Sequence, residues 1–304
     1  MKKIVCIDIG GSAIKYGIID ELGNILDKKQ QDTEAEEGGA AVLAKVISII
    51  KDYQKTNGID GVGISTTGFI DTEKGEVIYA SYRMPQYAGT KFKKTIEEEL
   101  NIPCEIENDV NCVGLAEYIS GAAKGSQISL CLAIGTGIGG SIVINGEVLH
   151  GASNCACEVG YLRMRGSDFQ ELGSTASLCK RVSEQKRNLG DSVHNWDGKR
   201  IFEAAKQGDD VCNKAIDEVV DIWGQGIADI CYVINPQVVV IGGGIMAQGE
   251  FLKPRIQNAL ERYLIPEIMV NTVLKIAKYE NDAGMIGAFY HFAKKRKLEL
   301  PYLL

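Results

Sequence analysis

Proline is scarce in this chain, and several features that identify other classes of protein are missing. The 304 residues include six prolines, and no proline-rich or low-complexity segment separates one part of the chain from another. No apolar run approaches the roughly 20 residues that a membrane-spanning helix needs. The N-terminus passes from Lys3 directly into an apolar run that carries Asp8, which is unlike a secretory signal. We therefore expect neither a membrane protein nor a secreted precursor.

Positive charge is also in short supply. Asp and Glu outnumber Lys and Arg by 40 to 33, so the net charge at pH 7 is −7. An acidic surface repels nucleic acid and anionic membranes, and neither is an expected partner. An anionic nucleotide can still bind through backbone amides and a metal ion.

The pattern of the nine cysteines does not predict a disulfide framework. Their number is odd, and they are scattered, mostly inside apolar runs as Cys6, Cys131 and Cys231 are. Such cysteines behave as small buried apolar residues in a reducing compartment. With 45% hydrophobic and 24% charged residues, we expect a globular cytoplasmic protein with an ordinary core.

The most informative pattern that is present is a strand–glycine–strand unit that occurs twice. Residues 3–9 and 129–134 are apolar runs, each followed by a glycine-rich turn and a second apolar run. Glycine lets backbone N–H groups converge, and converging N–H groups bind phosphate. Ordinary hairpins are the alternative, but hydroxyl residues lie among the glycines of both turns and favour two phosphate loops. The residues predicted to hold a nucleotide there are Gly10, Gly11, Ser12, Lys15, Gly135, Thr136 and Gly137.

The second turn also has the G-x-G-x-x-G spacing of dinucleotide-binding proteins, at Gly135, Gly137 and Gly140. That motif requires a helix directly after the glycines. The β-branched apolar residues 141–144 predict a strand instead, so we reject a dinucleotide site.

A third glycine run follows the predicted strand at residues 237–241 and includes Gly243 and Gly244. Bare backbone there can lie flat against the purine or ribose of a nucleotide. A strand-to-helix turn without a ligand is equally compatible with this run on its own.

Two acidic residues are candidates for chemistry. Asp8 stands at a strand end beside a glycine turn, where a carboxylate can hold Mg²⁺ through water. Asp109 follows Asn108 and opens a predicted helix, so it can take a proton from a substrate hydroxyl that the Asn aligns. Asn and Asp are also ordinary helix N-cap residues, and the sequence is equally compatible with capping and catalysis.

The polar segment 150–161 contains a Cys-x-Cys pair and a nearby histidine, which is a partial zinc pattern. Only His150, Cys155 and Cys157 cluster there, whereas structural zinc has four ligands, so we expect no zinc site. Glu158 in the same segment is better suited to accept hydrogen bonds from sugar hydroxyls.

Strands and helices alternate in the predicted order, which implies a layered α/β protein. The expected lobes are residues 1–115 plus 285–304, where the last helix returns, and residues 116–284. The predicted strands are residues 3–9, 15–20, 24–28, 60–65, 104–107, 237–241 and 273–277, with the glycine hairpin at 128–146. The predicted helices are residues 39–53, 90–100, 110–120, 171–187, 199–207, 209–234 and 282–296.

In their order along the chain, these motifs resemble the ROK family of bacterial sugar kinases and sugar-responsive repressors. The resemblance covers essentially the whole chain. It implies an actin-like, ribonuclease-H-like ATPase fold, an α/β protein of two lobes with the active site in the cleft between them. The segments that carry it are the Asp8 turn and residues 65–71, 107–109, 135–140, 157–161 and 242–244.

The resemblance also implies roles for individual residues. Asp109 would be the general base, and the glycine loops would hold ATP with Mg²⁺. A small-molecule sugar would be the partner, and a homodimer is common in the family. The residues implied to bind the sugar are Gly68, Asn108, Glu158 and Glu171.

Tyr161 departs from the family pattern, in which most members have a histidine followed by a zinc-binding cysteine cluster. Residues 162–174 contain no cysteine. The tyrosine without the cluster is similar to β-glucoside kinases, which phosphorylate the 6-hydroxyl of the non-reducing glucose in cellobiose-like sugars. We therefore expect a carbohydrate kinase for a β-glucoside such as cellobiose, with Tyr161 at the sugar site. Glucokinase and N-acetylmannosamine kinase are the alternative activities.

A sugar-sensing transcriptional regulator on the same scaffold is the alternative from another class. Such a protein needs a helix-turn-helix domain, usually ahead of the kinase-like body. The first predicted strand begins at Lys3, so the regulator is disfavoured.

Overall fold

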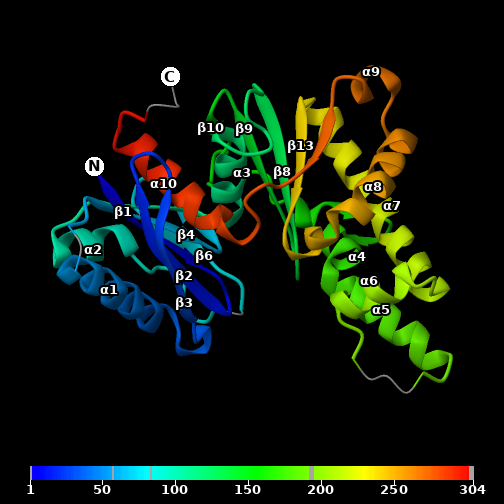
Figure 1. Ribbon diagram of the computed structural model, residues 1–304, viewed down its shortest axis with the longest axis horizontal. Coiled ribbons are helices and arrows are strands. Elements are labelled where there is room, and N and C mark those ends of the chain that lie inside the picture. The colour runs from blue at the N-terminus through cyan, green and yellow to red at the C-terminus, as the bar shows by residue number, and fades with distance from the viewer. Residues whose placement is uncertain (1, 57, 83, 192–194, 301–304) are drawn as a thin grey trace. The chain divides into compact units, whose positions relative to one another are not determined.

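The computed structural model describes residues 2–56, 58–82, 84–191 and 195–300 (Figure 1). The chain forms two compact units, and it passes between them more than once. Unit 1 comprises Met1–Ser120, Val148–Ala156 and Asn281–Leu304, and unit 2 comprises Gly121–Glu147 and Cys157–Glu280.

Each unit has a five-stranded sheet built to one plan, in which an antiparallel hairpin is extended on one side by parallel strands. In unit 1 the order is β3-β2-β1-β4-β7, and in unit 2 it is β10-β9-β8-β13-β14. The strands of the first sheet are β1 (Lys3–Ile9), β2 (Ala13–Asp20), β3 (Ile25–Asp32), β4 (Gly61–Thr66) and β7 (Cys104–Asn108). Those of the second are β8 (Ile128–Ile134), β9 (Ile138–Ile144), β10 (Glu147–Val148), β13 (Val238–Gly242) and β14 (Val273–Ile276).

Helices cover both sheets, and none in the described residues is long and apolar enough to span a bilayer. Unit 1 contains α1 (Gly39–Thr56), α2 (Phe92–Leu100), α3 (Asp109–Ile119) and α10 (Ala283–Lys295). Unit 2 contains α4 (Phe169–Gly173), α5 (Thr175–Asn188), α6 (Gly198–Lys206), α7 (Asp210–Ile234), α8 (Gly249–Tyr263) and α9 (Pro266–Met269). Two small hairpins complete the chain, β5 (Phe69–Asp71) with β6 (Glu76–Tyr79) and β11 (Arg163–Met164) with β12 (Ser167–Asp168).

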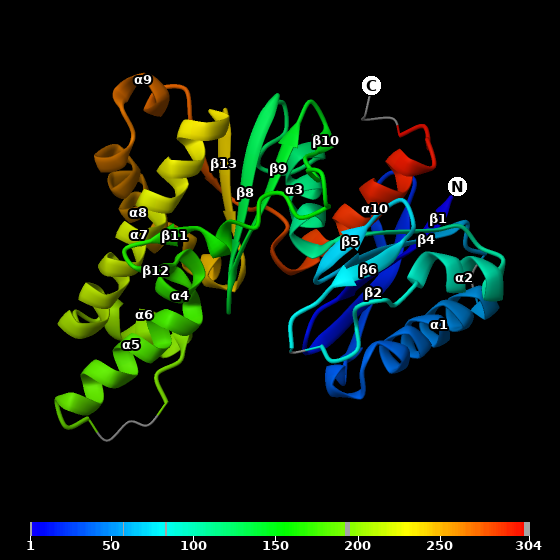
Figure 2. The same ribbon diagram turned by 180° about the vertical axis from the view of Figure 1, so that it is seen from behind.

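Strand β4 shows how the sequence places the helices of unit 1. Its alternate residues point to opposite faces of the sheet. Val62 and Ile64 join the apolar core that α1 and α2 share. On the other face a Cβ atom added at Gly61 would lie 2.1 Å from Phe292, and one added at Gly63 would lie 2.5 Å from the Ala288 carbonyl oxygen. Glycine at these positions therefore lets α10 rest directly on the strands, on the face opposite α1 and α2 (Figure 2).

Most predicted strands and helices are observed to within a few residues, but one predicted helix is wrong. Residues 171–187 belong to two helices, α4 and α5, separated by Ser174. Ser174 has an extended backbone (ψ 161°), and its side chain accepts a hydrogen bond from the Ser177 N–H. A serine that caps α5 cannot also continue α4. The β5–β6 hairpin was not predicted, because its strands are short.

Candidate functional site

In unit 1 the carboxyl ends of three neighbouring parallel strands carry polar residues. Strand β4 runs parallel to β1 and to β7, and the register pairs Asp8 with Ser65 and Thr66 with Asn108. Parallel strands end at the same edge of a sheet, where α/β proteins place their ligands. The fold thus gathers Asp8, Ser65 and Asn108 at one edge, and Asp109 follows at the start of α3.

The Asp8 carboxylate is held closely between a strand and a helix. Its Oδ1 accepts a hydrogen bond from Ser65 Oγ at 2.6 Å. A Cβ atom added at Gly284, near the start of α10, would lie 2.4 Å from that oxygen, so no larger residue fits there. Removal from water raises the pKa of Asp8, while the Ser65 hydrogen bond and the Lys15 charge oppose the rise.

Asn108 both caps α3 and orients the neighbouring acid. Its Oδ1 accepts hydrogen bonds from the Val110 N–H at 2.9 Å and the Asn111 N–H at 3.0 Å, which is an N-cap. Its Nδ2 donates to the Gly68 carbonyl and to Asp109 Oδ1, both at 3.0 Å. The predicted site residues Gly68, Asn108 and Asp109 therefore form one connected group.

Asp109 has an unusual acidity for an aspartate. Removal of the carboxylate from water and the negative charge of Asp8 raise the pKa of Asp109 to about 6, against hydrogen bonds from the Val110 N–H and from Asn108. At neutral pH such a carboxylate is mostly ionised, yet it is more basic than an ordinary aspartate. These are the properties that a general base requires.

The first glycine turn is hydrogen-bonded to Thr33, the residue that follows strand β3. Thr33 Oγ1 donates to the Gly10 carbonyl at 2.7 Å, and the Thr33 N–H donates to the Ser12 carbonyl at 3.0 Å. Gly11 and Ser12 remain exposed at the tip. Lys15 lies opposite Asp8 in the hairpin register, and its Nζ donates to the Asn281 carbonyl at 3.3 Å. The turn is thus held in place with exposed backbone at its tip.

In unit 2 two glycine turns lie side by side at the ends of β8 and β13. The first is closed by the Gly135 N–H, which donates to the Gly137 carbonyl at 2.9 Å, and α5 donates to the Gly135 carbonyl through the Thr175 N–H. Gly243 has a positive φ of 92°, and a Cβ atom there would lie 2.2 Å from the Ile134 carbonyl oxygen. Thr136 is at the tip of the first turn, and Gly244 borders open space. This edge therefore presents bare backbone.

The remaining predicted sugar-site residues lie in unit 2, near the first of these turns. Glu158 precedes a short 3-10 helix, Val159–Tyr161, and Tyr161 is 53% exposed. Gly160 of that helix packs against the Ile138 carbonyl and the side chain of Gln170 in α4. Glu171, also in α4, is exposed. The predicted sugar-binding residues are thus divided, with Gly68 and Asn108 in unit 1 and the other three in unit 2.

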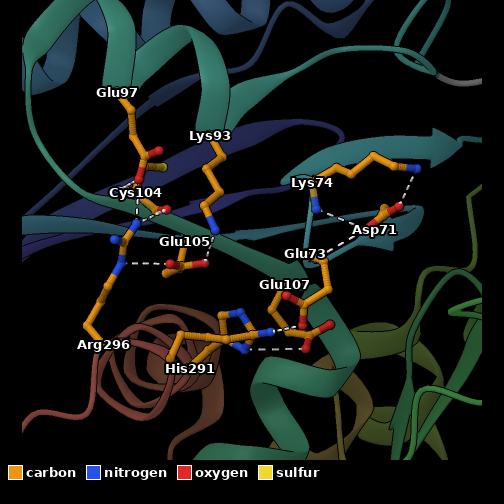
Figure 3. Close-up of polar contacts among 11 residues, drawn as sticks. Asp71, Glu73, Lys74, Lys93, Glu97, Cys104, Glu105, Glu107, His291 and Arg296 are labelled. Carbon is orange, nitrogen blue, oxygen red and sulfur yellow. Dashed lines mark hydrogen bonds and ion pairs between the residues drawn. The ribbon is translucent and has the colours of Figure 1, made fainter.

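Sequence analysis gave no role to Glu107, which is buried on β7 immediately before Asn108. Its Oε2 is joined to His150 Nε2 by a 2.6 Å hydrogen bond. The same oxygen lies 3.4 Å from His291 Nδ1 (Figure 3). Burial opposes its charge, but the His150 hydrogen bond and the His291 and His150 charges hold the pKa of Glu107 below its usual value. The available signal was a short predicted strand, residues 104–107, in which two acids alternate with apolar residues directly ahead of Asn108.

Ser65 and Gly284 were not predicted as site residues either. Their contacts with Asp8 depend on strand register and on the path of α10, which the sequence does not display. Within the described residues, no three His, Cys, Asp or Glu side chains come together as a set that could hold a metal ion.

Comparison with known proteins gives a consistent result. Residues 4–295 match the family described as "ROK family". A β-glucoside kinase of Klebsiella pneumoniae is 30% identical over 95% of this chain and 96% of its own length. A glucokinase of Halalkalibacterium halodurans is 29% identical over 93% of this chain and 92% of its own length.

A solved structure extends the likeness to three dimensions. The crystal structure of a ROK family glucokinase from Streptomyces griseus, in complex with glucose and AMPPNP, superposes with a TM-score of 0.81 at 26% identity. The match covers 94% of this chain and 97% of that one. The predicted α/β fold, with the two domains of actin-like proteins, is confirmed.

Proposed function

Because this chain belongs to the ROK family, we propose that it transfers the γ-phosphoryl group of ATP to the 6-hydroxyl of a hexose, with a β-glucoside such as cellobiose as acceptor. It is a phosphotransferase with an alcohol group as acceptor. The observation that carries the proposal is the Asn108–Asp109 turn. A carboxylate whose pKa is about 6 is oriented there by an amide that also contacts Gly68.

In the proposed reaction Asp109 removes the proton from the sugar hydroxyl as its oxygen attacks the γ-phosphorus. The residues proposed to bind the sugar are Gly68, Asn108, Glu158, Tyr161 and Glu171. Phosphoryl transfer needs little covalent help from a protein, so most of the catalysis is positioning and charge neutralisation.

ATP is proposed to bind at the glycine turns. The residues proposed to hold the phosphates are Gly10, Gly11, Ser12, Lys15, Gly135, Thr136 and Gly137. The turns expose Gly11, Ser12 and Thr136 at their tips, and Lys15 supplies an ammonium group. Gly243 and Gly244 would lie against the nucleoside. Mg²⁺ usually keeps several waters and takes one or two carboxylates, so the single Asp8 carboxylate fits it. When bound, the ion would neutralise charge on the phosphates.

Tyr161 supports a disaccharide acceptor. Its half-exposed ring offers a flat apolar surface on which a second sugar ring can stack. The alternative is that the tyrosine only fills space, which would leave a site for glucose or N-acetylmannosamine.

The proposal also includes a cytoplasmic location, which cell fractionation would test, and a homodimer, which light scattering would test.

The test is ADP release with cellobiose, glucose and N-acetylmannosamine under identical ATP and Mg²⁺. We expect the highest kcat/KM for cellobiose and, by NMR, a product phosphorylated at the 6-position. If either monosaccharide is favoured tenfold, about 1.4 kcal/mol in transition-state binding, the β-glucoside acceptor is wrong and the kinase stands. If no sugar in a wider panel supports ADP release, the proposed function is wrong.

A further inference from the structure

Strand β7 carries two buried acids, Glu105 and Glu107, on the same face of the sheet. Glu105 has two strong cations as partners, Lys93 Nζ at 2.9 Å and Arg296 Nε at 2.7 Å (Figure 3). Buried carboxylates require such partners, because leaving water costs them several kcal/mol. The pairing of Glu105 therefore accounts for its burial without any part in the site.

Glu107 has a different set of partners, and they belong to three separate segments. Its Oε1 accepts hydrogen bonds from the Asn108 N–H at 2.8 Å and from Asn111 Nδ2 at 3.2 Å, both at the start of α3. Its Oε2 faces His150 at 2.6 Å and, in α10, His291 at 3.4 Å. One carboxylate thus connects the turn that carries Asp109, the helix α10 and the segment Val148–Ala156.

The segment Val148–Ala156 is an excursion of the chain into unit 1, flanked on both sides by unit 2. It is closed on itself by the Ala156 N–H, which donates to the His150 carbonyl at 3.0 Å. Gly151 and Asn154 have positive φ angles, so its backbone is tightly turned. Glu158, a proposed sugar ligand, follows the segment along the chain. The His150–Glu107 hydrogen bond, short and to a buried charged acceptor, is of the strong kind.

We propose that Glu107 and His150 are a pair of positioning residues for the sugar site, which hold the Asn108–Asp109 turn and the segment leading to Glu158 in one arrangement. The inference rests on the proposed kinase function and deepens it. Neither side chain touches the reacting atoms. Asn108 keeps its own hydrogen bonds to the Val110 and Asn111 N–H groups, so loss of the pair should free the segment that leads to Glu158 and leave Asp109 in place. Sugar binding should therefore weaken more than the rate of phosphoryl transfer.

The experiment compares His150→Gln with His150→Asn. The glutamine amide reaches about as far as imidazole Nε2 and can still donate to Glu107, whereas the asparagine amide is one methylene too short. We expect the KM for the sugar to stay within about threefold of wild type in His150→Gln and to rise about 10- to 100-fold in His150→Asn, the range for a hydrogen bond to a charged group. The KM for ATP should be unchanged in both.

Glu105→Gln is the matched control, since Glu105 is equally buried on the same strand but is not joined to the excursion. It should lower the melting temperature without changing the KM for the sugar. The double variant Glu107→Gln/His150→Asn is compared with its two single variants. It should bind the sugar no more weakly than whichever single variant binds it less tightly, because both changes break the same interaction.

Three outcomes would overturn the pair. These are an unchanged sugar KM in His150→Asn, an equal rise in Glu105→Gln, and additive effects in the double variant. Calorimetric titration with the sugar alone checks binding for any folded variant that turns over too slowly. Wild-type protein that releases no ADP with any sugar would instead refute the kinase function itself, and the pair with it.

Discussion

The two units repeat one sheet but end its strands differently. In unit 1 the hairpin β1–β2 is extended by parallel strands β4 and β7, and in unit 2 the hairpin β8–β9 is extended by β13 and β14. The edge of unit 1 carries Asp8, Ser65 and Asn108. The matching edge of unit 2 carries Gly135 and Gly243. One scaffold thus gathers acidic and amide side chains beside a glycine turn in unit 1 and two glycine turns in unit 2. The strand ends, rather than the sheet itself, distinguish the two copies.

The largest effect should come from removing Asp109, the acid proposed as the base. Asp109→Asn should lower kcat about 10²–10⁴-fold, because the base is lost. The folded chain holds this proton more tightly than the unfolded chain, so ionised Asp109 opposes folding at neutral pH, and the variant should melt no lower than wild type.

Steady-state kinetics and thermal melting measure both effects of Asp109→Asn. Asp52→Asn, an exposed acid of α1 paired with Lys55, is the control and should be fully active. Activity of Asp109→Asn within about threefold of wild type would remove Asp109 from the role of base.

The second prediction concerns the close approach of α10 to Asp8. Ala normally stabilises a helix relative to Gly by about 1 kcal/mol. At position 284 its Cβ would displace the Asp8 carboxylate, and displacements of about 1 Å can cost 10²-fold in rate. We therefore expect Gly284→Ala to be folded but about 10²-fold slower.

Gly287→Ala separates the two effects of filling space under α10. Its Cβ would lie 1.9 Å from the Cys112 carbonyl oxygen in α3, away from Asp8, so it should lower the melting temperature more than Gly284→Ala does. A Gly284→Ala enzyme with wild-type kcat would show that the position of Asp8 is not critical.

The third prediction is the acid limb of the pH profile. The proposed base must be ionised, and its pKa is raised to about 6, so kcat/KM for the sugar should be level above that pH and fall about tenfold per unit below it. The apparent value belongs to the Asp8–Asp109 pair. In Asp8→Asn the fall in kcat/KM should therefore begin at a lower pH. It can be measured on the activity that this variant retains. A limb near pH 4 in wild type would contradict the interaction between the two acids.

The smallest effect is expected in unit 2. Gly243 has a positive φ and no room for a Cβ, so Gly243→Ala should cost about 1–3 kcal/mol of strain. Differential scanning calorimetry should record a fall of several degrees in melting temperature, and the KM for ATP should rise while that for the sugar does not. Gly244→Ala, beside open space, is the control for the melting temperature. A larger change in the KM for the sugar than in the KM for ATP would contradict the proposal that Gly243 binds the nucleotide.

The sequence could predict the fold and the Asn108–Asp109 turn because their signals are local. Apolar runs bounded by glycine reveal strands such as residues 3–9, and Asn108-Asp109 before a helix is visible as a motif. The role of Glu107 could not be predicted, because His150 and His291 approach it from distant parts of the chain. The predicted helix at residues 171–187 is two helices because Ser174 caps the second one. The spacing of apolar residues does not show whether a serine will cap a new helix or continue the existing one.

The late place of α10 in the sequence also decides the order in which the two units can finish folding. This helix packs on α3, β4, β1 and β7 and is synthesised after all of unit 2. On the ribosome the strands of unit 1 emerge first, yet the glycine face of β4 stays uncovered until α10 is released. Unit 2 can therefore close its core earlier, although most nascent proteins fold their N-terminal domain first. During that interval the strand face around Gly61 and Gly63 is uncovered, and transiently exposed surface of this kind makes folding intermediates prone to aggregation.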